Sequence, residues 1–463
     1  MMTEEKKARP FGFADKIGYA FGDFGNDFTF MLSVMFLMKF YTDVVGVSAA
    51  IVGIMMMVAR FVDAFTDVAM GQIVDRSAPA KDGKFKQWMR RFMGPVAVAS
   101  ALIFAPWVAS FPMGGRIAWM LITYILWGSV CYTGVNIPYG SMASAITSDP
   151  KERQSLSTWR TIGATMAATA IGVILPMVVY YRDAEGHTMI SSGRMFGAAV
   201  VCSIGAIVCY LLCLSLTTER VKIEKVGGKG GEKVNVIKTI FTSRSLLGII
   251  VAALVFLLAQ LSLSGMAAYI FPNYFNNAKG QSMVTLVGTV VTLVLSVFVS
   301  KLVSRFGKKE VGIIGSLLTT ATLLVIYFLH TTNMTVYIVL YAVAYIGLAL
   351  FNLIIWAMIT DVIDDMELKN GVRQDGTVYS VYSFARKLGQ AFSSGLTGGL
   401  LTIIGYTKET QFDESVVNGI YDVTAIAPAI GFAVLAVVLI FLYPLSRKKV
   451  EENAKALAAK RAS

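Results

Sequence analysis

The sequence predicts an all-α polytopic membrane protein whose twelve transmembrane helices form two six-helix bundles. Hydrophobic residues make up 56% of the 463 residues, and charged residues only 15%. Twelve apolar segments are each long enough to cross a hydrocarbon core of roughly 30 Å as a helix. Soluble proteins carry about 25% charged residues. The composition therefore excludes a soluble enzyme, a disordered chain and a disulfide scaffold.

A polar, glycine-rich stretch at 218–245 separates the first six apolar segments from the last six and predicts a flexible linker. We expect an N-terminal bundle at 17–217, a C-terminal bundle at 246–444, and terminal tails at 1–16 and 445–463. The expected spans are 17–41, 50–74, 92–109, 117–142, 158–180, 194–217, 246–275, 283–304, 311–330, 335–361, 376–404 and 422–444.

The basic residues that give the net charge of +12 are concentrated in the predicted loops and tails. With both termini in the cytoplasm, 31 of the 41 Lys and Arg residues lie on the cytoplasmic side and 5 on the other. The positive-inside rule therefore orients the chain with both termini cytoplasmic. We expect a bacterial inner (plasma) membrane protein in contact with the lipid bilayer. Nucleic acid is not an expected partner, because little basic surface faces water.

Several kinds of chemistry have no counterpart in the sequence. The four cysteines have neither disulfide nor metal-site spacing, and the two histidines lie near the ends of predicted spans. The phosphate-binding loop of ATPases does not occur. We expect no enzyme activity and no cofactor. Energy for transport would come from an ion gradient or from the substrate itself.

Charged side chains inside the predicted spans are the candidate functional residues, because a charge at the bilayer centre costs at least ~3 kcal/mol. They are Asp23, Asp27, Lys39, Arg60, Asp63, Asp67, Arg160, Arg386 and Lys387, with Asp361 at the end of span ten.

The second span holds Arg60, Asp63 and Asp67 at positions i, i+3 and i+7, on one face of a helix. Two carboxylates one turn apart can ligate a metal cation such as Na⁺, or one can hold a proton while the other stays charged. Arg60 would act as their charge partner. The alternative is an ion pair between Arg60 and Asp63 that serves helix packing alone.

Two further spans offer polar groups for a ligand. Asp27 on span one suits paired hydrogen bonds from sugar hydroxyls, or it could form an ion pair with Arg160 or Lys387. On span four, Thr133 and Asn136 lie one turn apart beside Pro138, which kinks the helix. These two side chains could coordinate a ligand or bond to a neighbouring helix.

Span eleven combines aromatic, hydroxyl and cationic residues at three- and four-residue spacing, a pattern typical of a sugar-binding wall. Trp356 on span ten is either a stacking platform or an interface anchor. The span-eleven residues are Tyr379, Tyr382, Ser383, Arg386 and Lys387.

Basic turns occur at matching positions of the two halves. The turn after span two contains Gly71-x₃-Asp75-Arg76 and then Gly83-Lys84, and the turn after span eight contains Arg305 to Lys309. The first turn resembles the loop signature of the major facilitator superfamily. Candidate gating residues in the loops are Asp75, Arg76, Lys84, Arg153, Asp361, Asp364 and Arg373.

Nearly the whole chain resembles the glycoside–pentoside–hexuronide:cation symporter family, of which the melibiose permease is the best-known member. The motifs that carry the resemblance are Gly25-Asn26-Asp27-Phe28, Tyr41-Thr42-Asp43-Val44-Val45-Gly46, Val58-Ala59-Arg60-Phe61-Val62-Asp63-Ala64-Phe65-Thr66-Asp67, Gly83-Lys84-Phe85-Lys86, Thr123-Tyr124-Ile125-Leu126-Trp127-Gly128, and Asp361, Asp364 and Glu367 before Arg373.

The resemblance implies a major facilitator fold with alternating access by rocking of the two bundles. It also implies that the cation binds at Asp63 and Asp67 with contributions from Thr133 and Lys387. Asp27 and Arg160 match the family's sugar-binding positions.

Two positions depart from the melibiose permease, which has an aspartate where this chain has Asn136 and a tryptophan where it has Gly140. Here the chain is more similar to the glucuronide and pentoside branches. Losing a carboxylate favours an acidic sugar, whereas Asp27 favours a neutral one.

We therefore expect a secondary active transporter, a monomer that imports a sugar together with a monovalent cation, Na⁺ or H⁺. The sugar would contact Asp27, Asn136, Arg160, Trp356, Tyr382, Ser383, Arg386 and Lys387. One alternative is a cation-coupled carrier of a lipid or another amphiphile. The other is a membrane sugar sensor that moves nothing.

Overall fold

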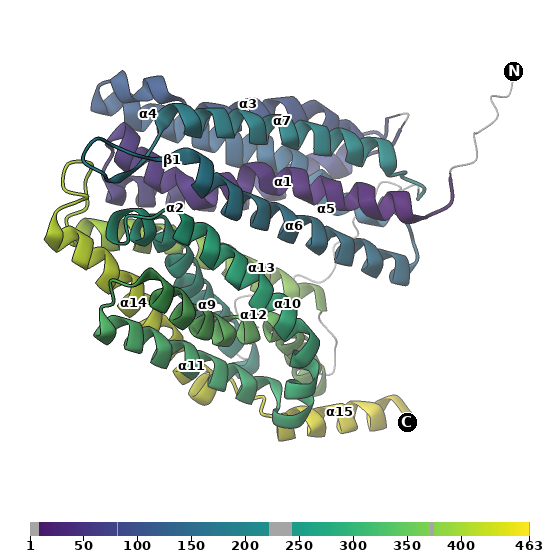
Figure 1. Ribbon diagram of the computed structural model, residues 1–463. Coiled ribbons are helices and arrows are strands. Elements are labelled where there is room, and N and C mark those ends of the chain that lie inside the picture. Colours follow the sequence, from purple (N-terminus) through teal and green to yellow (C-terminus); the bar gives the residue numbers. More distant parts are fainter. Residues whose placement is uncertain (1–8, 81, 222–242, 371–374, 463) are drawn as a thin grey trace, which may run out of the picture. The chain divides into compact units, whose positions relative to one another are not determined.

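The structure, a computed structural model, describes residues 9–80, 82–221, 243–370 and 375–462. In these ranges its regular structure is helical apart from one short hairpin (Figure 1). The chain forms two compact units. The first unit comprises Met1–Val47, Phe61–Asp183 and Met189–Lys229, and the second Ser48–Arg60, Ala184–Thr188 and Gly230–Ser463. The bundle boundaries that the sequence predicts stay predictions.

Long helices joined by short irregular segments form the N-terminal half. Its helices are α1 (Phe13–Phe40), α2 (Ala49–Arg76), α3 (Lys86–Ile103), α4 (Met113–Ile125), α5 (Thr133–Ile146), α6 (Pro150–Val179) and α7 (Ser192–Leu216). The shorter elements are the π-helical segments η1 (Tyr41–Val45) and η3 (Leu126–Tyr132), the 3₁₀ segment η2 (Pro106–Ser110), and the hairpin strands β1 (Tyr180–Arg182) and β2 (Thr188–Ile190).

The C-terminal half, like the N-terminal half, is built of long helices and short π-helical segments. Its elements are α9 (Arg244–Tyr269), η4 (Ile270–Tyr274), α10 (Lys279–Phe306), α11 (Lys308–Leu329), α12 (Met334–Asn370), α13 (Asp375–Ile403), α14 (Glu414–Val437), η5 (Val438–Leu442) and α15 (Arg447–Ala462).

Ten helical segments in the described ranges are long and apolar enough to cross a membrane. They coincide with ten of the twelve predicted spans, and α4, η3 and α5 together make one of them. The other two predicted spans fall on α3 and α13. These two helices are more polar, because α3 begins with Lys86, Arg90 and Arg91, and α13 carries Arg386 and Lys387.

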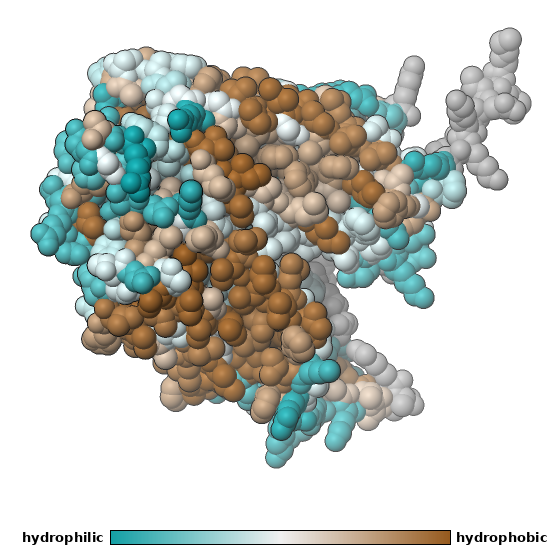
Figure 2. Space-filling model, viewed as in Figure 1, coloured by the Kyte–Doolittle hydropathy of each residue, from teal (hydrophilic) through white to brown (hydrophobic). Residues whose placement is uncertain are grey.

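Hydrophobic side chains cover the flanks of the helices, as a lipid environment requires. Phe65, Val297, Phe328 and Ile403 expose 71–82% of their surface. Figure 2 shows hydrophobic residues along the helices and hydrophilic residues gathered near helix ends. A water-soluble protein would instead bury such residues.

The predicted C-terminal tail is mostly a helix, α15. Its sequence is rich in Ala, Glu and Lys, which have high helix propensity. Asn453 on α15 is buried and donates a hydrogen bond of 3.3 Å to Asp365 Oδ1 on α12. This contact fixes α15 to the second unit.

The helices that carry the candidate sugar-binding residues, α1 and α6, cross where Gly163 meets Ala20. A Cβ atom at Gly163 would collide with the backbone carbonyl oxygen of Ala20, so only glycine permits this approach. Asp23 and Arg160 each lie three residues from the crossing, on the faces that meet. The crossing therefore sets the separation of these two charged side chains.

We predict that Gly163→Ala destabilises the protein by about 1–3 kcal/mol, because the added methyl group must push two backbones apart. The measurement is thermal unfolding of the purified protein in detergent. Gly197→Ala on α7 is the matched control, since a Cβ there meets nothing within 4 Å. Equal melting temperatures for the two variants would contradict the role assigned to the crossing.

Candidate functional site

The two aspartates of α2 are each bound by a hydroxyl group from the neighbouring helix. Ser129 Oγ donates a hydrogen bond of 2.5 Å to Asp63 Oδ1. Thr133 Oγ1 donates one of 2.8 Å to Asp67 Oδ1. Asp63, Ser129 and Thr133 are buried, whereas Asp67 is half-buried. Together these four residues form what we call the α2–α5 oxygen cluster.

A local irregularity in the backbone positions the hydroxyls. Leu126–Tyr132 is π-helical, and such segments occur often at functional sites. Thr133 also lies 3.2 Å from the carbonyl oxygen of Gly128. A Cβ atom at Gly128 would lie 3.4 Å from Asp63 Oδ1, so this turn of backbone lies directly beside the carboxylate.

The α2–α5 oxygen cluster offers the ligands that a hard cation prefers. Its two carboxylates and two hydroxyls are oxygen donors of the kind that hold alkali and alkaline-earth ions in proteins. The same carboxylates could instead take up a proton. The residues present fit either Na⁺ or H⁺.

For two further residues, membership of the cation site stays a prediction. Arg60 lies on α2, three residues before Asp63, and is half-buried. Lys387 lies on α13 in the second unit and is also half-buried.

Arg160 on α6 pairs with Asp23, whereas the sequence offered a pair with Asp27 only as an alternative to sugar binding. Its Nε lies 3.2 Å from Asp23 Oδ1, and its guanidinium lies over the ring of Tyr139 at 5.4 Å from the centroid. Asp27, one turn further along α1, is half-buried and accepts no hydrogen bond from the described residues. The sequence marked Asp23 as a charge in a span but gave no means of choosing between the two carboxylates.

A second polar contact set connects α1, α5 and α7. The amide nitrogen of Asn26 lies 3.4 Å from Asn136 Oδ1, and Tyr210 donates a hydrogen bond of 2.9 Å to Asn26 Oδ1. Asn26 and Tyr210 are buried, and Asn136 is half-buried. Asn26 lies in the quoted motif beside Asp27, which is the signal that could have identified it.

The second unit contains a cluster of aromatic rings around one cation. The rings of Trp356 on α12 and Tyr382 on α13 meet edge to face at 5.0 Å. The Arg386 guanidinium lies 5.4 Å from the Trp356 centroid and 3.4 Å from the Tyr382 hydroxyl. Trp356 is 48% exposed and Ser383 is exposed, so part of this cluster is accessible.

The predicted gating residues of the first unit lie at or near helix ends. Lys84 Nζ donates a hydrogen bond of 2.9 Å to the Asp75 carbonyl, and Arg153 Nε one of 2.9 Å to the Thr147 carbonyl. Asp75, Arg76 and Arg153 are exposed.

In the second unit, Asp361 pairs with Lys308 at 2.6 Å, and Asp364 is half-buried. Arg373 lies outside the described residues. Sequence reasoning missed Asp365, which is buried and accepts a 2.6 Å hydrogen bond from Ser245.

Glu219, also missed, caps the beginning of α3. Its carboxylate accepts hydrogen bonds from the backbone nitrogens of Lys84, Phe85 and Lys86 at 2.7–3.0 Å. In return, Lys86 Nζ donates to two carbonyls at the end of α7, with 2.5 Å to Thr217. The start of α3 and the end of α7 thus cap each other, which favours both helix dipoles.

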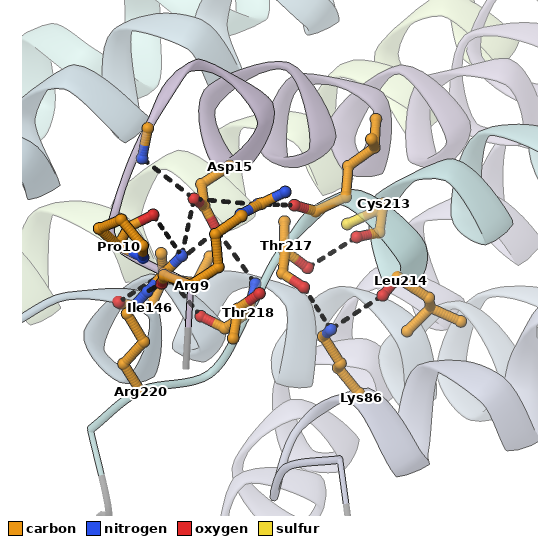
Figure 3. Close-up of polar contacts among 12 residues, drawn as sticks. Arg9, Pro10, Asp15, Lys86, Ile146, Cys213, Leu214, Thr217, Thr218 and Arg220 are labelled. Atoms are coloured by element: carbon orange, nitrogen blue, oxygen red, sulfur yellow. Dashed lines mark hydrogen bonds and ion pairs between the residues drawn. The ribbon is translucent and has the colours of Figure 1, made fainter. Parts of the chain in front are cut away.

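Asp15 at the beginning of α1 completes this network (Figure 3). It accepts hydrogen bonds from Arg220 at 2.9 Å and Arg9 at 3.2 Å, and from the backbone nitrogens of Gly12 and Thr218. The segment 218–221, which the sequence places in a flexible linker, is therefore bound, together with Thr217, to the ends of several helices.

Comparison with known proteins gives consistent matches over almost the whole chain. A family model described as MFS/sugar transport protein matches residues 18–447. The glucuronide carrier protein homolog of Escherichia coli (strain K12) is 32% identical over 442 residues, which cover 94% of this chain and 93% of that protein. The putative glycoside/cation symporter YagG of the same organism is 30% identical over 455 residues, which cover 97% and 95%.

A solved structure also matches the fold. The bacterial homolog to the human lysosomal transporter Spinster, in an inward-facing and unoccupied conformation, has a TM-score of 0.68 with 11% identity. The match covers 95% of this chain and 97% of that one. At this identity the likeness concerns the fold alone.

We predict that Ser129→Ala weakens cation binding about tenfold, because Asp63 loses a charge-assisted hydrogen bond and the cation loses an oxygen ligand. Ser129→Thr should restore most of the affinity. The measurement is the cation concentration that gives half-maximal stimulation of substrate uptake. Ser141→Ala is the control, since among the described residues its hydroxyl bonds to a backbone carbonyl of its own helix. Unchanged cation dependence in Ser129→Ala would contradict the assignment.

We predict that Glu219→Ala lowers the free energy of unfolding by about 1–3 kcal/mol, because three backbone N–H groups lose their acceptor. Thermal unfolding in detergent measures the effect. Glu185→Ala, which removes an exposed carboxylate from a loop, should leave stability unchanged. If both variants unfold together with the wild type, Glu219 is not a cap of energetic importance.

Proposed function

The chain belongs to the MFS/sugar transport protein family, and from this premise we propose that it imports a sugar together with Na⁺ or H⁺ by alternating access. The chain is a membrane transporter and not an enzyme. The proposal extends to the residues that bind the two solutes: the α2–α5 oxygen cluster for the cation, and Asp27, Asn136 and Arg160 for the sugar.

The observation that carries the proposal is the double attachment of α5. Thr133 on α5 bonds to Asp67 of the oxygen cluster. One turn further, Asn136 contacts Asn26, the neighbour of Asp27 on α1. A cation and a sugar bound at these places would therefore act on the same helix turn within the first unit.

Coupling follows from the charge of the cluster. Without a cation, Asp63 and Asp67 accept hydrogen bonds from the Ser129 and Thr133 hydroxyls. A bound monovalent cation offsets one of the two negative charges, and those hydroxyls can then turn their lone pairs toward it. Thr133 would then shift, and Asn136 would move with it because the two residues lie one turn apart on α5. By thermodynamic linkage, the sugar must strengthen cation binding by the same factor.

The sugar site combines donors and acceptors that suit a polyhydroxylated ring. Asp27 accepts hydrogen bonds from hydroxyls, and the Arg160 guanidinium donates to them. In the second unit, Trp356, which is 48% exposed, offers an aromatic face of the kind that packs against the apolar face of a sugar. Arg386, Lys387 and Ser383 supply further donors there. The names of the similar proteins, a glucuronide carrier homolog and a glycoside/cation symporter, support this substrate class.

We place the protein in a bacterial inner membrane as a monomer with both termini in the cytoplasm. The excess of basic residues in alternate loops supports this orientation.

We predict that Asp63→Asn or Asp67→Asn abolishes cation-stimulated uptake, because the cluster can no longer change its charge on binding. Any remaining sugar binding should be independent of the cation. The measurement is counterflow of labelled sugars in proteoliposomes, over a panel of neutral and acidic sugars, with and without Na⁺ at two pH values.

Asp413→Asn serves as the control, since the Asp413 side chain accepts no hydrogen bond at the start of α14. Unchanged cation stimulation in both cluster variants would overturn the cation site. Absence of counterflow for every sugar in the wild-type protein would overturn the function itself.

A further inference from the structure

The charge of Arg160 is balanced by a carboxylate of the protein itself. Asp23 lies 3.2 Å from its Nε, and the Asp23 side chain is only 11% exposed. The side chain of Arg160 is 40% exposed. In this ion pair the arginine is therefore accessible, whereas its carboxylate partner is nearly buried. A substrate that approaches Arg160 meets an ion pair and not a bare cation.

Arg160 nevertheless keeps most of its hydrogen-bonding capacity. Its Nε is the donor used in the pair with Asp23, and within the described ranges Nη1 and Nη2 donate to no protein acceptor. Space lies next to Nη1, because a Cβ atom at Gly140 would have only this nitrogen within 4.0 Å. A guanidinium has five N–H donors. Four of them therefore remain for a ligand at a position where the pair is already neutral.

Asp27 adds the opposite kind of group. It lies one turn after Asp23 on α1, and it accepts no hydrogen bond from the described residues. With both carboxylates ionised, Asp23, Asp27 and Arg160 together carry a net charge of −1. A sugar hydroxyl can accept from Arg160 while another donates to Asp27. A carboxylate on the substrate would compete with Asp23 for Arg160 and would be repelled by Asp27.

We propose that Asp23 determines the charge preference of the sugar site: by occupying Arg160, it selects uncharged sugars over acidic ones. This inference rests on the proposed function and refines its substrate class. Asp23 acts through Arg160, so it is a specificity-determining residue that positions the arginine. Removing its charge would free Arg160 to pair with the acid group of a substrate.

The test uses two ligands that differ only at the sugar C6 group, p-nitrophenyl-β-D-glucoside and p-nitrophenyl-β-D-glucuronide. Each is titrated as a competitor of the transported sugar, and its inhibition constant is measured in proteoliposomes. We expect the wild-type protein to prefer the glucoside. Asp23→Asn should shift the ratio of the two constants toward the glucuronide by about tenfold or more, because a charge-assisted hydrogen bond is gained.

Asp27→Asn is the matched variant, since it removes the same charge one turn away without touching the ion pair. Equal shifts in the two variants would overturn the proposal, because they would reflect net charge alone. Adding Arg160→Gln to Asp23→Asn should abolish the gain for the glucuronide. A shift that survives this second change would also overturn the proposal.

The wild-type preference and Asp23→Glu keep the test decisive if Asp23→Asn does not fold. Asp23→Glu retains the carboxylate and should keep the preference for the glucoside. A wild-type protein that prefers the glucuronide overturns the inference but leaves sugar transport standing. A wild-type protein for which no sugar shows counterflow overturns the proposed function instead.

Discussion

The architecture of the first unit depends on one constraint: a charge inside a hydrocarbon layer must be compensated by a close neighbour. The cost of an uncompensated charge there is at least about 3 kcal/mol. In the candidate site, the contacts described above for each charged group come from a helix other than its own. Asp63 and Asp67 of α2 accept hydrogen bonds from η3 and α5, and Arg160 of α6 pairs with a carboxylate of α1. The contacts that hold these helices together are therefore the same contacts that set the chemistry of the candidate site.

This constraint also explains why polar residues concentrate on a few helix turns. A hydroxyl can compensate a carboxylate without adding a second charge, and it can reverse its role from donor to acceptor when a cation arrives. A lysine in place of Ser129 or Thr133 would hold the aspartates permanently. Ligand-dependent change therefore requires weak, reversible partners, and the α2–α5 oxygen cluster has them.

Helical periodicity and residue chemistry were sufficient to predict the spans and to put Asp63 and Asp67 on one face. The family resemblance, and not periodicity, implies Thr133 as a neighbour of the two aspartates, and the structure brings it to Asp67. Ser129 escapes prediction because the π-helical segment before α5 alters which residues face α2. Such a segment has no clear signature in a single sequence.

Other contacts could not be predicted from the sequence, because they depend on how two helices are rotated relative to each other. Asp23 and Asp27 are both plausible partners of Arg160, and the close approach at Gly163 decides between them. Glu219 was missed for a different reason. It lies beyond the last turn of α7, and its partners are backbone nitrogens, which every sequence contains.

The bound segment 217–221 has a mechanical consequence. Glu219, Arg220 and Thr218 attach the end of α7 to the beginnings of α1 and α3, and the backbone of Arg220 and Val221 bonds to Ala145 at the end of α5. Tension applied to the chain beyond residue 221 is therefore distributed over four helices at once. A pull that would unwind the last turn of a single helix is converted into a rigid-body load on the first unit.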